Sequence, residues 1–439
     1  MRRLLIVLTA LLAVWVQAQE LPRRGTLGVP FQAAPPEVRD PLKLGPQEAL
    51  QVANDANGLK KGDLVLALNG KRFKTFGEWA ELGRAATTHK TAKLTIRRGD
   101  KEEDVEVTIQ PKVADKGENY ETIYDHVVSN GHRIRTFVTK PKAEGKRPVL
   151  FWIQGINASS VEQPLTGAGG TSRILKSFSD DGYVTVRVEK PGVGDSEGGP
   201  ALDVGFDEEL DIYRQALKAL DRYDFVDRSQ VYVFGHSMGG CHAPLVCAEL
   251  PVKGIVTYGT VSDSWLEWQI KAERVQSPLG GTARGQVDRD VRQIIALYHY
   301  IYNEKRSIAW IKENRPELKE VADQASPDGK MMSVRSIRYM QEVNDKNFCE
   351  FWAKLGKTRV LALFGEFDFV SLQSCQEQVA LAVNAANPGM ALYQVVPQSD
   401  HGFMKQATMQ ESFAKFGRPG NEFNPAVIDA MKAWIKSLG

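Results

Sequence analysis

The chain has few cysteines and no excess of charge of either sign. Its 439 residues include only four cysteines (Cys241, Cys247, Cys349 and Cys375), and their spacing matches no zinc-binding motif. Lysine and arginine number 56, against 54 aspartates and glutamates. A balanced surface provides no electrostatic attraction for nucleic acid or for an acidic membrane. The composition therefore argues against a nucleic-acid-binding protein and against a cysteine-ligated metal site.

Long apolar runs are missing as well, except at the N-terminus. Met1–Arg3 is basic and Leu4–Val16 is apolar, and small residues stand at positions −3 and −1 of a cut after Ala18. This is the pattern of a secretory signal peptide. We expect residues 1–18 to be removed and the protein to be exported, either periplasmic or secreted. An uncleaved N-terminal anchor is the alternative, although the run is short for a membrane span. No transmembrane segment is expected in the mature chain.

Export permits disulfides, because the compartments outside the cytoplasm are oxidising. Cys349 and Cys375 flank one expected strand and form the expected pair. Cys241 and Cys247 are expected to be small core residues. No cysteine lies near the expected cut, so no lipid-modified N-terminus is expected.

Residues 25–111 have the pattern of a separate small unit. The block Asn57–Lys71 contains the letters GLKKGD, an alternating apolar strand and an Asn-Gly turn. A helical stretch, Phe76–Ala86, and two strands joined by Gly99-Asp100 follow it. The block resembles the corresponding stretch of PDZ domains, and the order of the elements resembles the bacterial type.

The PDZ resemblance implies a peptide-binding loop. In such domains the backbone N–H groups of a loop capture the C-terminus of a partner protein, which adds as a strand. Here the loop would be Gly25–Phe31, with Thr26, Leu27 and Gly28 as the residues that hold the carboxylate. The expected strand over residues 51–56 is mostly polar, so a purely structural or dimerising role is the alternative.

Residues 112–119 form a polar linker that is expected to be flexible, and from residue 120 to residue 439 the chain alternates strands and helices. An Asn130-Gly131 turn joins the first two expected strands as a hairpin. The later strands are apolar and of the buried parallel type. The expected strands are 122–129, 132–139, 149–153, 184–188, 231–235, 254–258, 360–364 and 391–396, and the expected helices include 173–179, 208–220, 374–384 and 425–438. The pattern predicts the α/β class, with a doubly wound and mostly parallel sheet.

A helical insertion over about residues 262–351 separates the sixth expected strand from the seventh. It is rich in tryptophan and tyrosine: Trp265, Trp268, Tyr298, Tyr300, Tyr302 and Trp310. An insertion at this place would cover the carboxyl ends of the strands as a lid. The alternative is that its aromatic residues form only the core of the insertion itself.

The sequence GHSMG at residues 235–239 lies between an apolar strand and a segment that can form a helix. This is the arrangement of a nucleophile elbow, in which a serine on a tight turn projects its hydroxyl above a sheet. A second G-x-S-x-G match surrounds Ser196, but Gly-Gly-Pro follows it and ends regular structure. Ser237 is therefore the predicted nucleophile, and Ser196 is predicted to be a turn residue.

A serine hydroxyl needs a general base and an acid that orients the base. Of the seven histidines, only His401 directly follows the last core strand, from which a loop can reach the elbow. Asp368 follows another buried strand between aromatic neighbours, where a carboxylate needs a partner. Ser237, Asp368 and His401 are the predicted catalytic residues. Glu366 is the rival acid, and Asp400 is predicted to be a turn residue.

The chain order serine, aspartate, histidine resembles that of the α/β-hydrolase superfamily, and the resemblance covers residues 120–439. It implies the α/β-hydrolase fold. An oxyanion hole needs two N–H donors. Met238, at the start of the helix after the nucleophile, is one expected donor. By position in the family the second is the N–H of Ile156, although Gln154 stands where the family usually has histidine.

The predicted function is that of an exported serine hydrolase, which cleaves a carboxylic ester or a related acyl bond through an acyl-enzyme. No metal and no organic cofactor are expected. The expected partners are a small acyl or peptide substrate and, at the PDZ-like unit, a protein C-terminus. Two alternatives stay open: a serine peptidase directed to peptides by the PDZ-like unit, and a catalytically inactive binding protein. The fold hosts many chemistries, and no residue selects among these substrates.

Overall fold

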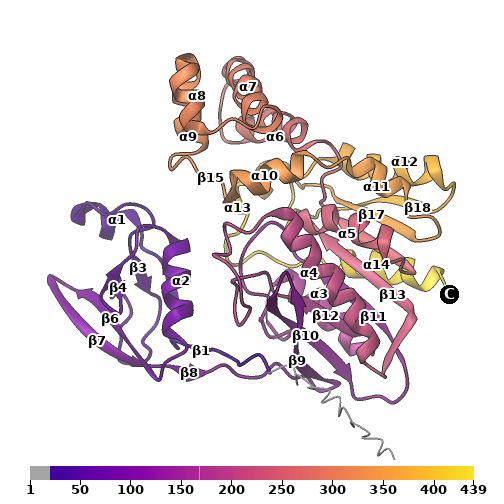
Figure 1. The fold of residues 1–439 in the computed structure, drawn as a ribbon, viewed down its shortest axis with the longest axis horizontal. Coiled ribbons are helices and arrows are strands. Elements are labelled where there is room, and N and C mark those ends of the chain that lie inside the picture. Colours follow the sequence, from indigo (N-terminus) through magenta and orange to yellow (C-terminus); the bar gives the residue numbers. More distant parts are fainter. Residues whose placement is uncertain (1–19, 168) are drawn as a thin grey trace, which may run out of the picture.

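The computed structural model describes residues 20–167 and 169–439, which fold as two units of different size (Figure 1). The smaller unit, drawn in indigo and purple, lies beside the larger one and continues into it after the short β1–β8 ribbon. The expected signal peptide, residues 1–18, lies outside the described residues, so its cleavage stays a prediction. No helix in the two described ranges is long and apolar enough to cross a membrane.

The smaller unit is built on a six-stranded sheet with the order β2-β3-β4-β6-β7, and β5 pairs with β4. Strand β4 (Leu64–Leu68) is buried along its whole length, and the helix α2 (Phe76–Ala86) packs Trp79 against Phe31 of β2. Of the mostly polar stretch 51–56, only Gln51 and Val52 belong to a strand, β3 (Leu50–Val52), which is three residues long. The remaining elements are β1 Gly25–Thr26, β2 Phe31–Ala33, α1 Pro36–Arg39, β5 Lys71–Arg72, β6 Thr91–Arg98, β7 Lys101–Thr108 and β8 Gln110–Pro111.

The larger unit contains an eight-stranded sheet with the order β18-β17-β14-β13-β11-β12-β10-β9. The hairpin β9–β10 is antiparallel and enters the sheet beside β12, and all later neighbours are parallel. This is the mostly parallel sheet of the predicted α/β-hydrolase fold. The strands are β9 Tyr120–Ser129, β10 His132–Pro141, β11 Arg147–Ile153, β12 Val184–Val188, β13 Val226–His236, β14 Gly254–Tyr258, β17 Arg359–Gly365 and β18 Ala391–Val396.

Helices cover both faces of this sheet. Side chains alternate along β11, so Phe151 and Ile153 pack on one face while Leu150 and Trp152 pack on the other. The first face is covered by α4 (Phe206–Ala219), α5 (Met238–Glu249) and α12 (Gln373–Ala386). The second is covered by α3 (Gly170–Asp180) and α14 (Ala426–Ser437). The two cores hold the strand ends in place, where the loops that carry the chemistry begin.

The helical insertion, residues 262–351, leaves the sheet after β14 and returns before β17. Some of its aromatic residues form its own core and others line a cavity. Tyr302 is fully buried. Trp265 and Trp268 stack with 4.4 Å between their ring centroids and line a cavity next to the sheet. The elements are α6 Trp265–Leu279, α7 Arg284–Tyr298, a π-helical turn His299–Asn303, α8 Ile308–Asn314, α9 Lys319–Ala325, β15 Met331–Met332, β16 Arg335–Ser336, α10 Ile337–Asn344 and α11 Phe348–Ala353.

The linker between the units differs from the flexible segment that its polar composition suggests. Asp115 is buried and pairs with the buried Arg187 of β12, with 2.8 Å between Oδ2 and Nη2. The other carboxylate oxygen of Asp115 accepts hydrogen bonds from the N–H of Leu165 and the hydroxyl of Tyr120. One charged side chain therefore anchors the linker to the larger unit.

The two units also touch through the loop 191–202, which follows β12. The guanidinium of Arg84 in α2 donates to the carbonyl of Ser196, and the backbone N–H of Arg24 donates to Asp195 at 2.9 Å. Gly77 of α2 lies so close to Leu202 that a Cβ there would approach its side chain to 2.8 Å.

The expected disulfide between Cys349 and Cys375 is wrong, because all four cysteines are free thiols. Each of the two sulfurs faces a polar group instead of the other sulfur. Cys349 Sγ donates to the carbonyl of Ser262 at 3.7 Å, and Cys375 Sγ lies 3.4 Å from the Asp263 carboxylate. Two residues that precede and follow the same strand in the sequence, as Cys349 and Cys375 do, need not lie close together in space.

The linker anchor leads to a stability prediction. Substitution Asp115→Ala leaves Arg187 buried without its counter-ion, and losing one partner of a buried pair costs about 3–5 kcal/mol. Urea unfolding followed by circular dichroism should show that loss. The exposed neighbour Glu118 serves as the control, because Glu118→Ala should change the free energy of unfolding by about 0.5 kcal/mol or less. Equal stability of the two variants would contradict the anchoring role of Asp115.

Candidate active site

Ser237 occupies a strained turn between strand β13 and helix α5. Its φ is +55° and its ψ is −124°, a conformation that ordinary residues avoid. The turn is so tight that a Cβ on Gly235 would meet the backbone of Gly239 and Gly240, and one on Gly239 would overlap the carbonyl of Ile153. The Ser237 N–H donates to the carbonyl of Tyr258 at 2.9 Å. This geometry is that of a nucleophile elbow, with the hydroxyl at the carboxyl end of the central strand.

His401 and Asp368 lie on the loops after β18 and β17, and the structure brings them together. The Nδ1 of His401 is 2.8 Å from Oδ2 of Asp368. The Ser371 hydroxyl donates to the same oxygen at 2.6 Å, while the N–H groups of Val370 and Ser371 donate to Oδ1. Burial would raise the pKa of Asp368, but the neighbouring His401 and the hydrogen bonds outweigh it and hold the pKa below its usual value. Asp368 is thus an ionised carboxylate whose oxygens are all engaged.

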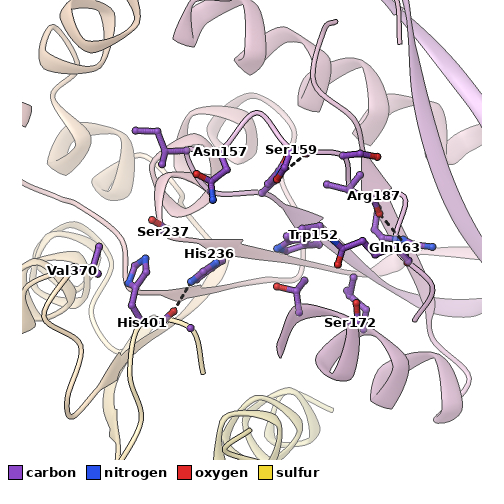
Figure 2. A pocket seen from close by; sticks show the side chains of 18 of the residues that line it. Trp152, Asn157, Ser159, Gln163, Ser172, Arg187, His236, Ser237, Val370 and His401 are labelled. Atoms are coloured by element: carbon purple, nitrogen blue, oxygen red, sulfur yellow. Dashed lines mark hydrogen bonds between the residues drawn. The ribbon is translucent and has the colours of Figure 1, made fainter. Parts of the chain in front are cut away.

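The ring of His401 lies beside Ser237 (Figure 2), and the two residues border the same cavities. A serine hydroxyl, an imidazole and a buried carboxylate in this order can form a relay for proton transfer. The structure thus places the three sequence-predicted catalytic residues in one site.

Gly259, directly after β14, is a residue of the site that sequence reasoning missed. Its φ is +63°, and a Cβ built on it would lie 2.8 Å from His401 Nδ1 and 2.9 Å from Asp368 Oδ2. Both contacts are below any normal van der Waals distance, so only glycine fits against the pair. In the sequence, Gly259 is recognisable only as a glycine directly after a core strand. That position does not show that it contacts His401 and Asp368, which are far away in the chain.

His236, next to the nucleophile, supports the backbone of His401. Its Nε2 is 2.9 Å from the His401 carbonyl oxygen, and the two rings are 4.9 Å apart. Burial lowers the pKa of His236 to about 3, so the ring is neutral and Nε2–H donates the bond. The side chain holds the loop that carries the candidate base.

The other polar residues weighed for this site lie elsewhere. Glu366 accepts a hydrogen bond from the N–H of Gln398 at 2.8 Å, and no hydrogen bond joins it to His401. Asp400 accepts from the N–H groups of the turn that follows it. The Ser196 hydroxyl is fully buried and accepts from the N–H of Arg135 at 3.0 Å. These three side chains serve loop structure.

The expected oxyanion donors Met238 and Ile156 flank Ser237. Met238 is the first residue of α5, so no carbonyl of the helix accepts its N–H. The peptide group between Gly155 and Ile156 lies against the nucleophile, since a Cβ on Gly155 would be 3.2 Å from that of Ser237. The buried Lys190 donates from Nζ to the carbonyl of Gly155 at 2.7 Å.

Two cavities meet at Ser237. One, of about 380 Å³, lies beneath the loop after β11 and is shown in Figure 2. The other, of about 510 Å³, lies beneath the helical insertion. Ile156, Val370 and His401 border both cavities together with the nucleophile. A substrate bound at Ser237 can therefore extend into either cavity.

The PDZ-like loop forms one wall of a separate groove. Thr26 and Leu27 line this groove of about 300 Å³, and Trp79 and Arg84 of α2 form the opposite wall. Gly28 lies at φ +66°, and its N–H is taken by the Thr26 hydroxyl at 3.2 Å. Of the three predicted carboxylate-binding residues, two thus line the groove, and the N–H of the third is engaged within the loop.

Comparison with known families agrees with this architecture. The PDZ domain family matches residues 42–109, and the family described as "Serine aminopeptidase, S33" matches residues 167–404, more than half of the chain. The protein is thus an α/β hydrolase preceded by a PDZ domain. Within that class it belongs to the serine aminopeptidase S33 family. No curated protein sequence matches the chain.

Several solved structures are similar at low identity. Est1E from Butyrivibrio proteoclasticus, solved with ferulic acid bound, is 15% identical with a TM-score of 0.46, over 71% of this chain and 98% of that one. A puromycin-hydrolyzing peptidase of Mycobacterium tuberculosis is 14% identical with a TM-score of 0.46, over 80% of this chain and 45% of that one. A hypothetical protein from Pseudomonas aeruginosa is 12% identical with a TM-score of 0.46, over 76% and 100%. Likenesses this distant carry no information about the substrate.

The close approach of Gly259 to the His401–Asp368 pair predicts a catalytic defect. In Gly259→Ala the added methyl group must displace one of the two side chains, and we expect kcat to fall by about two orders of magnitude. Gly356 has nearly the same φ, +60°, but open space around it. Gly356→Ala therefore introduces the same backbone strain without the contact and should keep its activity. Steady-state kinetics on both variants would refute the argument if they lost activity equally.

Proposed function

We propose that this protein is an exported serine hydrolase that cleaves a carboxylic ester. The observation that carries the proposal is the strained Ser237 elbow, which shares its cavities with a His401 ring that is hydrogen-bonded to a buried carboxylate. Membership of an α/β-hydrolase family supports the hydrolase class. The export rests on the pattern of residues 1–18 alone.

The mechanism follows from the placement of these groups. Ser237 attacks the ester carbonyl carbon, while His401 accepts the hydroxyl proton and then donates it to the leaving alcohol. Asp368 holds the imidazole by its Nδ1–H and stabilises the positive charge that develops on the ring. Water then attacks the acyl-enzyme with His401 again as base. Neither step requires a metal or an organic cofactor.

The oxyanion that forms in each step needs donors, and Lys190 supports the assignment of one of them. In a trans peptide the C=O and the following N–H point in opposite directions. Lys190 holds the Gly155 carbonyl on one side, which directs the Ile156 N–H to the other. The Met238 N–H, at the start of α5, is the second donor. Each donor is worth about 3–4 kcal/mol of barrier.

Lys190 is itself held by buried charges. Its side chain and that of Glu209 in α4 are fully buried, with 3.1 Å between Nζ and Oε2. Arg335 from the helical insertion pairs with the same carboxylate and donates to the carbonyl of Ala201 at 2.9 Å. The network thus connects the insertion with the peptide group that borders the nucleophile.

A peptidase is the second candidate, and the groove of the PDZ domain favours it. A peptide C-terminus bound there would bring a polypeptide next to the larger unit, since Gly194 of the loop 191–202 also lines the groove. Parallel assays with nitrophenyl esters and with peptide nitroanilides distinguish the two candidates. Faster turnover of the peptides would favour the peptidase.

The nucleophile assignment is tested by two serine variants. Ser237→Ala should reduce ester hydrolysis by at least about 10⁴-fold, since it removes the attacking atom. Its fold should be kept, because alanine accepts the same backbone conformation as serine. Ser196→Ala removes only a hydrogen bond to Arg135 and should retain most activity. An active Ser237→Ala and an inactive Ser196→Ala would overturn the assignment. Failure of a fluorophosphonate to label the unsubstituted protein would favour the inactive binding protein.

The role of Lys190 is tested by a pair of variants within one network. Lys190→Met removes the hydrogen bond to the Gly155 carbonyl and so no longer fixes the direction of the Ile156 N–H. It should lower kcat by about 10²-fold, with KM within about threefold, because that N–H acts on the transition state. Arg335→Met also removes a partner of Glu209, but Arg335 has no hydrogen bond to Gly155. It should lower the unfolding temperature and leave kcat within about threefold. Equal losses of kcat in both variants would show that the network is only structural.

A further inference from the structure

One wall of the cavity of about 380 Å³ beside Ser237 contains no helix and no strand. This segment, residues 157–165, lies between β11 and α3 and is here called the wall loop. Figure 2 shows Ser159 and Gln163 of the wall loop on the same cavity as Ser237. Backbone outside helices and strands depends on other segments for its hydrogen bonds. The position of the wall loop is therefore set by the residues that contact it.

Glu162 joins the wall loop to the ribbon β1–β8, after which the PDZ domain continues into the larger unit. Its side chain is only 8% exposed and has two cationic partners. Nη2 of Arg23 lies 2.5 Å from Oε1, and Nζ of Lys112 lies 2.5 Å from Oε2. Arg23 precedes β1 and Lys112 follows β8. One carboxylate of the wall loop is thus held from both ends of the ribbon.

The other contacts of the wall loop come from the larger unit and from the linker. Arg187 of β12 donates to the carbonyls of Val161 and Gln163. Glu189, directly after β12, accepts from the N–H of Val161 at 3.1 Å. These contacts hold the backbone beside Glu162 without any part of the PDZ domain. Glu162 is therefore the contact through which the PDZ domain acts on the wall loop.

Lys112 also lines the groove of about 300 Å³ in the PDZ domain, so one residue borders the groove and pairs with the wall loop. Arg24 and Arg84 also line the groove, and no acidic residue does so in the described ranges. Neither guanidinium forms an ion pair with a carboxylate there, and each donates to a backbone carbonyl. Burial and the neighbouring Arg84 lower the pKa of Arg24, although three nearby carboxylates act in the opposite direction. A carboxylate in the groove would relieve this repulsion.

We propose that Glu162 is a positioning residue for the substrate, and that a carboxylate bound in the groove of the PDZ domain weakens this role by competing for Lys112. The inference rests on the proposed serine hydrolase function and adds a partner that regulates it. The partner is a peptide C-terminus with an apolar last residue, because Val29, Phe31 and Trp79 line the groove beside the cations. Glu162 does not border the cavity at Ser237, so it acts through the wall loop.

A loosened wall loop should reduce affinity and leave the chemical step unchanged. A substrate that touches the loop must then order it on binding, and ordering one residue costs a factor of about 10 in affinity. The loss is the same in the ground state and in the transition state, so KM rises and kcat is kept. A substrate too short to reach the loop should not be affected.

Two esters measured with the full chain test the positioning role. Hexyl hexanoate extends on both sides of the scissile bond and reaches the wall loop in either orientation, whereas ethyl acetate is too short. In Glu162→Gln we expect KM for hexyl hexanoate to rise by about 10-fold with kcat within about threefold, and kcat/KM for ethyl acetate to stay unchanged. Lys112→Met should raise KM less, because Arg23 remains, and Lys112→Arg should keep the original KM. Equal changes for both esters, or no change, would overturn the proposal.

Arg214→Met is the matched control for Lys112→Met. The side chain of Arg214 is 24% exposed, as is that of Lys112, and it pairs with Glu249 at 2.6 Å. Arg214 borders neither cavity at Ser237, so both esters should be hydrolysed as before. A rise in KM for hexyl hexanoate in Arg214→Met equal to that in Lys112→Met would show a general effect of lost ion pairs and overturn the proposal.

The effect of the groove is tested with acetylated hexapeptides of random sequence that end in valine, leucine or phenylalanine. With a free C-terminus, at millimolar concentration, they should raise KM for hexyl hexanoate, and the same peptides as C-terminal amides should not. The effect should be absent in Lys112→Met. It should also be absent for ethyl acetate, which excludes competition at Ser237. No effect of the free peptides, or an equal effect of the amides, would overturn the proposal.

Hydrogen exchange of the wall loop separates failure of this proposal from failure of the proposed function, because it requires no turnover. The N–H groups of Val161 and Leu165 are hydrogen-bonded to carboxylates, and they should exchange faster in Glu162→Gln. Unchanged exchange in a protein that hydrolyses both esters would overturn the positioning role and keep the hydrolase assignment. Faster exchange in a protein that hydrolyses no ester would support the role of Glu162 in the loop and refute the hydrolase assignment.

Discussion

The site depends on one buried hydrogen bond, between His401 Nδ1 and Asp368 Oδ2. Its two residues lie on loops after adjacent strands, and the parallel order β14-β17-β18 brings those loops to the same edge of the sheet. The carboxylate is buried, so it is stable there only because Ser371, Val370 and the imidazole donate to it. Gly259 has no side chain, because a Cβ would displace the pair. The fold thus provides both the contact and the space for it.

A second, charged arrangement supports the other side of the nucleophile. Lys190, Glu209 and Arg335 come from three different segments and form a fully buried network. Buried ion pairs contribute little net stability, but they restrict geometry, since an unpaired partner is costly. Here the restriction acts on the Gly155 carbonyl, and through it on the N–H that is proposed to meet the oxyanion. The insertion that carries Arg335 also lines the cavity of about 510 Å³ beside Ser237, so one segment contributes to both this network and that cavity.

Much of the architecture was predictable because its signals are local. The strands Val184–Val188 and Ala391–Val396 match the predicted bounds, since each is a short run rich in apolar and β-branched residues. Helix α3 begins at Gly170, earlier than its apolar pattern indicates, because glycine is a poor helix former and the sequence gives no start signal there. The strand–turn–helix around Ser237 and the residues after β17 and β18 pointed to the three candidate catalytic side chains. The fold class and the PDZ domain are confirmed.

What the sequence did not predict are contacts between segments far apart in the chain. Lys190 bonds to Gly155, Asp115 to Arg187, and Gly259 adjoins His401. No periodicity or spacing marks such pairs, because each depends on the relative positions of strands in the sheet. The expected disulfide failed for the same reason, since proximity was inferred from one strand instead of from the packing around it.

If Ser237 is the nucleophile of a working relay with His401, a reagent that reacts with activated serines should form a covalent adduct on it. The full chain is treated with a fluorophosphonate, digested and analysed by tandem mass spectrometry. We expect a single stoichiometric adduct on Ser237, and its formation should be lost when His401 is replaced by alanine. An adduct on Ser196 or on another serine, or no adduct on the folded protein, would contradict it.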